Sequence, residues 1–392
     1  ARMRWGGWPA LGESMVHHLV RCAATGHHLE AGHDGKLSVR SHAGDACMWT
    51  LQGSSSAPSS IRSSVHDVEL PVTLAAPARS SRGERGVSFT LQCPDGRPLA
   101  EDGMPCTVGA APAIFTAFLG PVRLPSEYLA ELRDSGYTVL DSVLHPEVIK
   151  QLKAEFARVR AEKFVKQSAH DGNFWMMNFL AETPLICNAA CHPVAVWLMQ
   201  QYIGVKALHL FHQPIVNTLK PARRLLGRHP PGGWHADYPY RRGRFLSDVY
   251  PPGDIMKLGV QYNICVDEFR ADNAATQFIP GSHLAGHEPP AALNEGGTVM
   301  GEGLHRDAVQ VTAPAGAAII YDSRTWHRAC HELNASGSDR IAILHAVGPA
   351  WIAPMMDKTR EAEAYLKSSV PGMLDPRTAR DIDRMCCGEL RL

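Results

Sequence analysis

Two histidines and one aspartate in the second half of this 392-residue chain have the types and spacing of a metal-ligand set. His235 and Asp237 are separated by one residue, so in an extended strand both side chains project to the same face. His327 follows at the end of a separate apolar segment, 315–322. Two imidazoles and one carboxylate suit a non-haem Fe(II) that keeps open positions for a co-substrate and O2. We therefore predict that His235, Asp237 and His327 bind the metal.

One arginine downstream offers a complementary group. Arg340 begins another apolar segment, 341–345, and its guanidinium could form a bidentate pair with the distal carboxylate of a 2-oxo acid. Two other histidines compete with His327 as ligands. His331 lies in the loop that follows, and His283 lies in a Pro-Gly-Ser-His turn. We expect structural or peripheral roles for both, because only His327 comes directly after the apolar segment.

The elements that must hold these residues are mostly strands. Helices are predicted before them, and Gly120-Pro121 marks a plausible boundary. The predicted strands are 137–140, 208–219, 258–266, 275–279, 308–312, 317–321 and 340–347. The predicted helices are 127–134, capped by Ser126, then 146–163, 192–202 and 378–385. This order favours a mainly β fold, a sandwich or barrel supported by helices on one side.

Residues 1–120 differ from the rest in their Gly, Ser, His and Pro content and in turn pairs such as Asp95-Gly96. An internal repeat is present as well. Val20-Arg21-Cys22 with Gly26 recurs as Leu91-Gln92-Cys93 with Gly96. We predict a β-rich accessory module, similar to an incomplete fascin-type or ricin-type β-trefoil, which would bind glycan or protein. Segments 54–64 and 75–86 are predicted to be mobile polar loops within it.

Composition excludes several classes of partner. The 45% apolar content supports a sizeable core, and the formal net charge of zero gives no reason to expect nucleic acid or an anionic membrane as a partner. No apolar run is long enough to span a bilayer. The ten scattered cysteines are typical of reduced thiols, which favours an intracellular location in the cytoplasm or an organelle. The chain does not start with Met, so its targeting cannot be predicted.

From residue 128 to 352 the chain resembles the phytanoyl-CoA dioxygenase family of Fe(II)/2-oxoglutarate oxygenases. Four segments in order carry the resemblance: 136–141, 213–221, 272–283 and Trp326-His327 with Arg340. The third contains Asn273 and the Pro-Gly-Ser-His turn. The resemblance implies a double-stranded β-helix (jelly roll, cupin-like) catalytic domain over residues 121–392, with a helical tail at its C-terminus.

The resemblance also assigns roles. It implies that His235, Asp237 and His327 bind Fe(II) and that Arg340 holds the distal carboxylate of 2-oxoglutarate. The side chains expected near this co-substrate are Asn217, Asn263 and Gln213. The reaction would consume O2 and release succinate and CO2. Because Asp237 retains the carboxylate that family halogenases lack, hydroxylation or another oxidation is favoured.

Two positions depart from the family pattern. Ala274 follows Asn273 where the family usually has Gly, a change expected to affect a turn and no ligand. Ala329 replaces a small hydroxyl residue two positions after His327, which removes one hydrogen bond to the co-substrate. Neither change alters the three expected metal ligands.

The substrate is predicted only as a class, a small or lipid-like molecule. Arginines at 223, 224, 228, 241, 242 and 244 flank the metal motif and could receive a carboxylate, a phosphate or a coenzyme A conjugate, or form solvated loops. Residues 174–179 could form an apolar pocket wall or plain core. Two alternatives stay open: a redox-neutral, cupin-type metal enzyme, and a binding protein whose oxygenase domain is vestigial.

Overall fold

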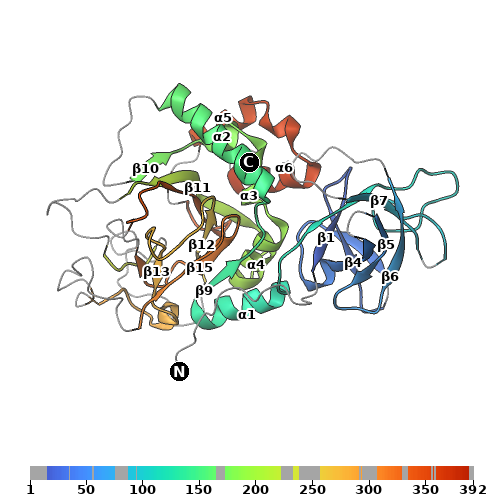
Figure 1. Ribbon diagram of the computed structural model, residues 1–392, viewed down its shortest axis with the longest axis horizontal. Coiled ribbons are helices and arrows are strands. Elements are labelled where there is room, and N and C mark those ends of the chain that lie inside the picture. The colour runs from blue at the N-terminus through green and yellow to red at the C-terminus, as the bar shows by residue number, and fades with distance from the viewer. Residues whose placement is uncertain are drawn as a thin grey trace.

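The computed structural model has two β-rich parts that lie side by side (Figure 1). It describes residues 16–387 apart from 35, 55–56, 76–86, 94, 165–172, 222–232, 238–256, 291–292, 294–306, 329–333, 355 and 357–358. Strands before residue 120 form one part, and the remaining strands with all the α-helices form the other. Among the described residues, no helix has the length and apolar character needed to cross a membrane.

The N-terminal part is a closed antiparallel barrel. Strands β1, β4, β5, β6, β7 and β8 follow one another around it, and β8 returns to pair with β1. A hairpin of β2 and β3 extends from β1. These strands are β1 His18–Cys22, β2 His28–Ala31, β3 Leu37–Arg40, β4 Met48–Ser54, β5 Ala57–Ser63, β6 Glu69–Leu74, β7 Val87–Leu91 and β8 Phe115–Leu119. The loop predicted at 54–64 is wrong, because β5 occupies most of it and pairs with both β4 and β6. Residues 76–86 of the other predicted loop lie outside the described residues.

The internal repeat of the sequence coincides with a repeated turn in the barrel. The Cys22 amide donates to the His27 carbonyl at 2.9 Å, and the Cys93 amide donates to the Arg97 carbonyl at 2.8 Å. Gly26 and Gly96 take φ values of +74° and +80° in these turns, a conformation that favours glycine. The assignment of the barrel as an incomplete β-trefoil stays a prediction.

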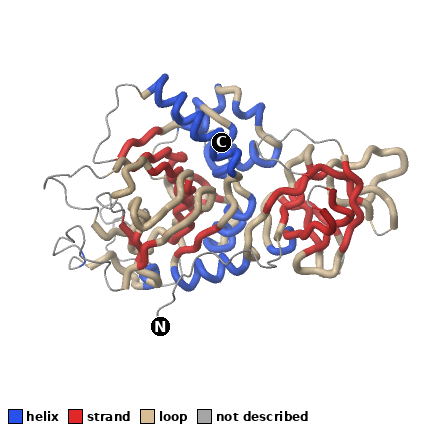
Figure 2. Tube along the Cα trace, viewed as in Figure 1, coloured by secondary structure: helices blue, strands red, loops and turns tan. Residues whose placement is uncertain are grey.

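The C-terminal part contains two antiparallel sheets (Figure 2). The larger has the order β10-β11-β17-β12-β15-β9 and the smaller β14-β13-β16. Their strands are β9 Tyr137–Leu140, β10 Asn173–Met176, β11 Leu208–Leu219, β12 Val260–Cys265, β13 Gln277–Phe278, β14 Val309–Gln310, β15 Ala318–Asp322, β16 His327–Arg328 and β17 Arg340–Pro349. An apolar cluster that includes Phe278, Ile319, Tyr321 and Ala342 fills the space between the two sheets. This arrangement confirms the predicted jelly roll.

Helices cover the opposite face of the larger sheet and form the main core with it. They are α1 Pro125–Ser135, α2 Pro146–Lys163, α3 Pro184–Ala190, α4 Pro193–Ile203, α5 Thr359–Lys367 and α6 Pro376–Ile382, which a π-helical turn, Asp383–Cys387, continues. All except α5 begin with proline, whose fixed φ suits the first helical position. Ser126 is therefore not the cap that the sequence suggested, because Pro125 begins α1 and Leu124 precedes it.

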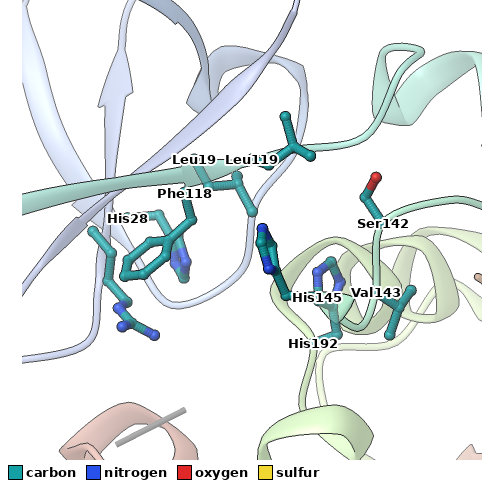
Figure 3. Close-up of a pocket in the computed structure, with 9 residues that line it drawn as sticks. Leu19, His28, Phe118, Leu119, Ser142, Val143, His145 and His192 are labelled. Atoms are coloured by element: carbon teal, nitrogen blue, oxygen red, sulfur yellow. The ribbon is translucent and has the colours of Figure 1, made fainter. Parts of the chain in front are cut away.

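Helix α6 connects the barrel to the jelly roll. Its buried Arg377 donates to the Cys191 carbonyl at 3.0 Å and to Asp381 at 2.9 Å, and Asp381 lies 3.1 Å from His42 of the barrel. A cavity of about 20 Å³ lies between barrel residues and the segments just before α2 and α4, including His145 and His192 (Figure 3). Its volume suffices for about one water molecule, so it is too small for an organic substrate.

Candidate metal centre

The three predicted metal ligands converge at one end of the jelly roll. One donor atom each from His235, Asp237 and His327 lies within 4.8 Å of the others. His327 Nε2 is 3.2 Å from Asp237 Oδ2, and His235 Nε2 is 3.8 Å from Asp237 Oδ1. In the described part of the chain this is the only such group of three or more. The donors thus surround a space of the right size for one metal ion.

Backbone hydrogen bonds fix the segments that carry these ligands. The His235 amide donates to the His327 carbonyl and the His327 amide donates to the His235 carbonyl, both at 3.1 Å. The Asp237 amide donates to the Ser323 carbonyl at 2.7 Å. The loop between β15 and β16 is anchored by a buried ion pair of Arg324 with Asp322 at 2.8 Å. Asp322 also accepts the Tyr202 hydroxyl at 2.7 Å. The loop is therefore tied to α4 on the outer face of the sheet.

Both imidazoles are oriented for metal binding. His235 Nδ1 lies 2.8 Å from the Gly233 carbonyl, and His327 Nδ1 lies 2.9 Å from the Thr325 carbonyl. A carbonyl can only accept, so each Nδ1 carries the proton and each Nε2 presents its lone pair. This pattern is the usual outer-shell support of histidine ligands.

The electrostatics of the metal-free centre favour a charged carboxylate. Burial opposes ionisation of Asp237, but the neighbouring His327 and His235 outweigh it and hold the Asp237 pKa below its usual range. Burial likewise disfavours the charged form of His327, yet Asp237 raises the His327 pKa above its ordinary value. Protons and a divalent metal therefore compete for the same donors.

Tyr321 is a site residue that the sequence reasoning did not single out. Its hydroxyl donates to Asp237 Oδ2 at 3.3 Å and lies 3.4 Å from His327 Nε2. Asn263, one of the three residues predicted to lie near the co-substrate, donates to the same hydroxyl at 3.4 Å. The interior direction of the Tyr321 side chain could have been predicted from the alternation of β15, because Ile319 and Tyr321 share one strand face.

Arg340 is a buried cation in the same interior. It is 5% exposed, its Cζ lies 4.0 Å over the Phe269 ring, and its Nη1 donates to the Ala274 carbonyl. Burial lowers its pKa to about 10. No carboxylate of the described residues forms a salt bridge with it, and its Nε has no hydrogen-bond partner there. An unneutralised buried guanidinium is a site for a ligand carboxylate.

Ala274 contributes more than the sequence suggested. It adopts φ +61°, the left-handed conformation that favours glycine and that fits the family preference at this position. Its backbone carbonyl also accepts the hydrogen bond of Arg340, so this turn helps to position the guanidinium.

The other residues predicted near the co-substrate lie on β11. Asn217 pairs with Ala342, two residues along the strands from the pair of Leu219 and Arg340, and thus shares the interior face with Arg340. Gln213 does not, because its amide contacts Cys386 at 3.6 Å on the helical side. A bulge between His212 and Ile215, around Pro214, shifts the alternation of the strand.

His212 takes the interior place that was predicted for Gln213. It pairs with Ala346, on the same face as Ala342, and is 9% exposed. Burial lowers its pKa, whereas Asp237 acts to raise it. The prediction that Gln213 shares the face of Asn217 is therefore wrong, because the bulge places His212 on that face instead.

Trp175 is a second interior-facing residue on the edge strand β10. It pairs with Asn217, and it is 51% exposed, whereas its neighbours Phe174 and Met176 are buried in the helical core. Most of the segment 174–179 is therefore core, and a role of Trp175 in a pocket wall stays a prediction.

The competing histidine His283 has a structural role, as predicted. It is 1% exposed and its Nε2 lies 3.1 Å from the Arg133 carbonyl. Several predicted residues lie outside the described ones: His331, Ala329 and the arginines at 223, 224, 228, 241, 242 and 244. Lys220 forms a salt bridge with Asp339.

Comparison with known proteins identifies relatives of the jelly-roll part. An uncharacterized protein of Mycobacterium tuberculosis, Rv1501, is 25% identical over 59% of this chain and 71% of its own length. The dioxygenase trt7 of Aspergillus terreus is 25% identical over 44% of this chain and 59% of its own length.

Solved structures with a similar chain path include HygX and SnoN. HygX from Streptomyces hygroscopicus, with nickel and 2-oxoglutarate bound, has a TM-score of 0.45 and 16% identity over 59% of this chain and 90% of its own. The non-heme alpha-ketoglutarate-dependent epimerase SnoN has a TM-score of 0.42 and 18% identity over 58% and 83%.

The family described as phytanoyl-CoA dioxygenase (PhyH) matches residues 132–342. The match includes His235, Asp237, His327 and Arg340 and spans more than half of the sequence. This chain therefore belongs to the phytanoyl-CoA dioxygenase (PhyH) family.

Proposed function

We propose that this protein is an Fe(II)- and 2-oxoglutarate-dependent dioxygenase that hydroxylates a small or lipid-like molecule. The observation that carries the proposal is the shared interior of two features: the His235, Asp237 and His327 donors, and the buried, unneutralised Arg340. The donor set fits a divalent iron with open positions. The arginine fits the free carboxylate of a dicarboxylate co-substrate.

The bound iron, with 2-oxoglutarate and O2, would supply the oxidising power and release succinate and CO2. The chain's own residues would position the metal and the co-substrate and shield them from water. The Nδ1 hydrogen bonds of His235 and His327 keep both rings aimed at the metal. Arg340 would orient the co-substrate, and the apolar cluster between the two sheets keeps the interior dry. No side chain is needed as a general base.

Asn217 and Asn263 are proposed to contact the co-substrate. Asn217 lies on the face of Arg340, and its buried Oδ1 has no hydrogen-bond partner among the described residues. Asn263 reaches the site through Tyr321. Trp175 pairs with Asn217 on the edge strand, and we propose that its half-exposed indole contacts an apolar part of the substrate. The substrate proposal is thus a molecule with an apolar portion that meets the edge strand β10.

Two further proposals concern the rest of the protein. The eight cysteines that the structure describes with their side chains are all buried, and no disulfide joins any two of them, which supports an intracellular, reducing location. The barrel before residue 120 is proposed as an accessory module for a glycan or protein ligand, on the basis of its separate apolar core.

The test measures metal content and co-substrate turnover together. Wild-type protein reconstituted with Fe(II) should bind one equivalent and convert 2-oxoglutarate to succinate slowly without substrate. His327→Ala should lose both, whereas His283→Gln, which changes a buried histidine outside the cluster, should retain both. Bound metal without succinate formation or 2-oxoglutarate binding would instead favour a redox-neutral metal enzyme.

A further inference from the structure

The small cavity between the barrel and the jelly roll has a basic lining (Figure 3). Its volume is about 20 Å³, and residues of both parts of the protein form its wall. The polar side chains of this wall are Arg21, His28, Ser142, His145 and His192, and no acidic side chain is among the residues that line it. Guanidinium, hydroxyl and imidazole groups can all donate hydrogen bonds. Such a lining suits a negatively charged ligand.

The barrel contributes a buried cation from the outer face of its first strand. Val20 and Cys22 belong to the barrel core, so by alternation Arg21 points outward, and it pairs with His28 of β2. Arg21 and His28 are only 6% and 2% exposed, although they lie on the outside of the barrel. The Arg21 Cζ lies 4.3 Å from the centre of the Phe118 ring, which also lines the cavity. The guanidinium charge is therefore held next to the cavity, where water screens it little.

The jelly roll contributes two histidines that directly precede helices. His145 comes before α2 and His192 before α4, and neither side chain caps its helix. The positive ends of two helix dipoles therefore lie beside the cavity and add to the attraction for an anion. The buried Nδ1 of His145 has no hydrogen-bond partner among the described residues. Since buried polar atoms are normally bonded to protein, water or an ion, this nitrogen indicates a ligand in the cavity.

We propose that this cavity binds one monatomic anion, chloride, which joins the barrel to the jelly roll. Arg21 of the barrel would balance the charge of the anion, and His145 of the jelly roll would donate a hydrogen bond to it from Nδ1. The volume of the cavity is that of about one water molecule, so phosphate, sulfate and organic carboxylates are too large for it. The inference is independent of the proposed oxygenase function, because the cavity lies at the junction with the barrel and shares no lining residue with the metal centre.

The experiment measures urea unfolding of the full chain in mixtures of sodium chloride and sodium gluconate at constant ionic strength. Gluconate is too large to enter the cavity. Fe(II) and 2-oxoglutarate are present without O2, so that chloride does not compete at the metal or at Arg340. The test variants are His145→Leu and Arg21→Met. His42→Gln is the matched control, since His42 also lies between the two parts, 3.1 Å from Asp381, but does not line the cavity.

We expect the unfolding midpoint of the wild type and of His42→Gln to rise with the logarithm of the chloride concentration, as it does for a ligand that binds only the folded state. In His145→Leu and Arg21→Met this rise should be lost. A midpoint that ignores chloride, or that responds equally in all four proteins, would overturn the inference and leave a cavity that holds water alone.

Bromide gives a direct measurement that needs no variant. Wild-type crystals soaked in sodium bromide should show anomalous scattering from one ion in the cavity, between Arg21 and His145. Soaked crystals without bromide at this position would overturn the inference, whatever the metal centre binds.

Discussion

Replacing Arg340 with methionine should make the ligand-free protein more stable and the co-substrate complex weaker. Burial lowers the Arg340 pKa to about 10 from an ordinary 12.5, which corresponds to about 3 kcal/mol of unfavourable desolvation of the cation. Methionine keeps much of the side-chain volume and removes the charge. It also leaves the Ala274 carbonyl without its donor, a loss of about 1–2 kcal/mol. The net expectation is a gain of about 1–2 kcal/mol in the free energy of unfolding.

The same substitution removes the proposed partner of the distal carboxylate of 2-oxoglutarate. Hydrogen bonds to charged groups contribute about 1.5–3 kcal/mol each, so 2-oxoglutarate affinity should fall roughly 10- to 150-fold or more. Urea unfolding with Fe(II), with and without 2-oxoglutarate and without O2, measures both effects. In the wild type the co-substrate should raise the midpoint, and in Arg340→Met this rise should largely vanish.

Arg377→Met provides the matched control for this experiment. Arg377 is also fully buried, but Asp381 neutralises it at 2.9 Å, far along the chain from the metal ligands. Breaking a paired buried charge is strongly destabilising, by about 3–5 kcal/mol. The reasoning is refuted if Arg340→Met unfolds as easily as Arg377→Met without ligand, or if it keeps the wild-type affinity for 2-oxoglutarate.

Three further predictions concern other residues. His345 is fully buried, and its pKa is lowered to about 3, mainly by burial and secondly by His212. The stability that the neutral imidazole contributes above pH 6.5 should therefore be lost as the pH falls, by about 2 kcal/mol at pH 5. Urea unfolding at a series of pH values should show a smaller loss in His345→Leu. Gly136→Ala should destabilise the protein by more than about 1 kcal/mol in thermal unfolding, because φ is +81° and a Cβ would lie 2.6 Å from Thr325 Oγ1; an unchanged midpoint would contradict this. Trp175→Ala should raise KM for the substrate with little change in the affinity for 2-oxoglutarate, whereas Trp351→Ala, at a more exposed tryptophan outside the site, should change neither.

Much of the jelly roll could be predicted because its strands are long, apolar and bounded by turns. Strand β11 begins and ends at the predicted residues, as do β9 and helix α2. The short strands β13 and β14 were predicted longer than they are, since two residues pair where the pattern covers five. Alternation alone does not show how far a ladder of hydrogen bonds continues.

The metal ligands were predictable because residue type and order carry the signal. Two errors near them have local causes. The bulge at Pro214 moved Gln213 to the helical side and His212 to the interior, and no periodic pattern reveals a bulge in advance. Tyr321 was missed because its phenol gains its meaning only from the return of the chain at His327. The sequence shows neither the bulge nor the distance between Tyr321 and His327.

The most direct test of the central claim is an anaerobic titration of the apoprotein with Fe(II) and then 2-oxoglutarate, followed in the visible spectrum. Chelation of Fe(II) by a 2-oxo acid gives a metal-to-ligand charge-transfer band. We predict this band in the wild type, its absence in His327→Ala, and its appearance in Arg340→Ala only at much higher 2-oxoglutarate. Wild-type protein that binds Fe(II) but shows no band on addition of 2-oxoglutarate would contradict the account.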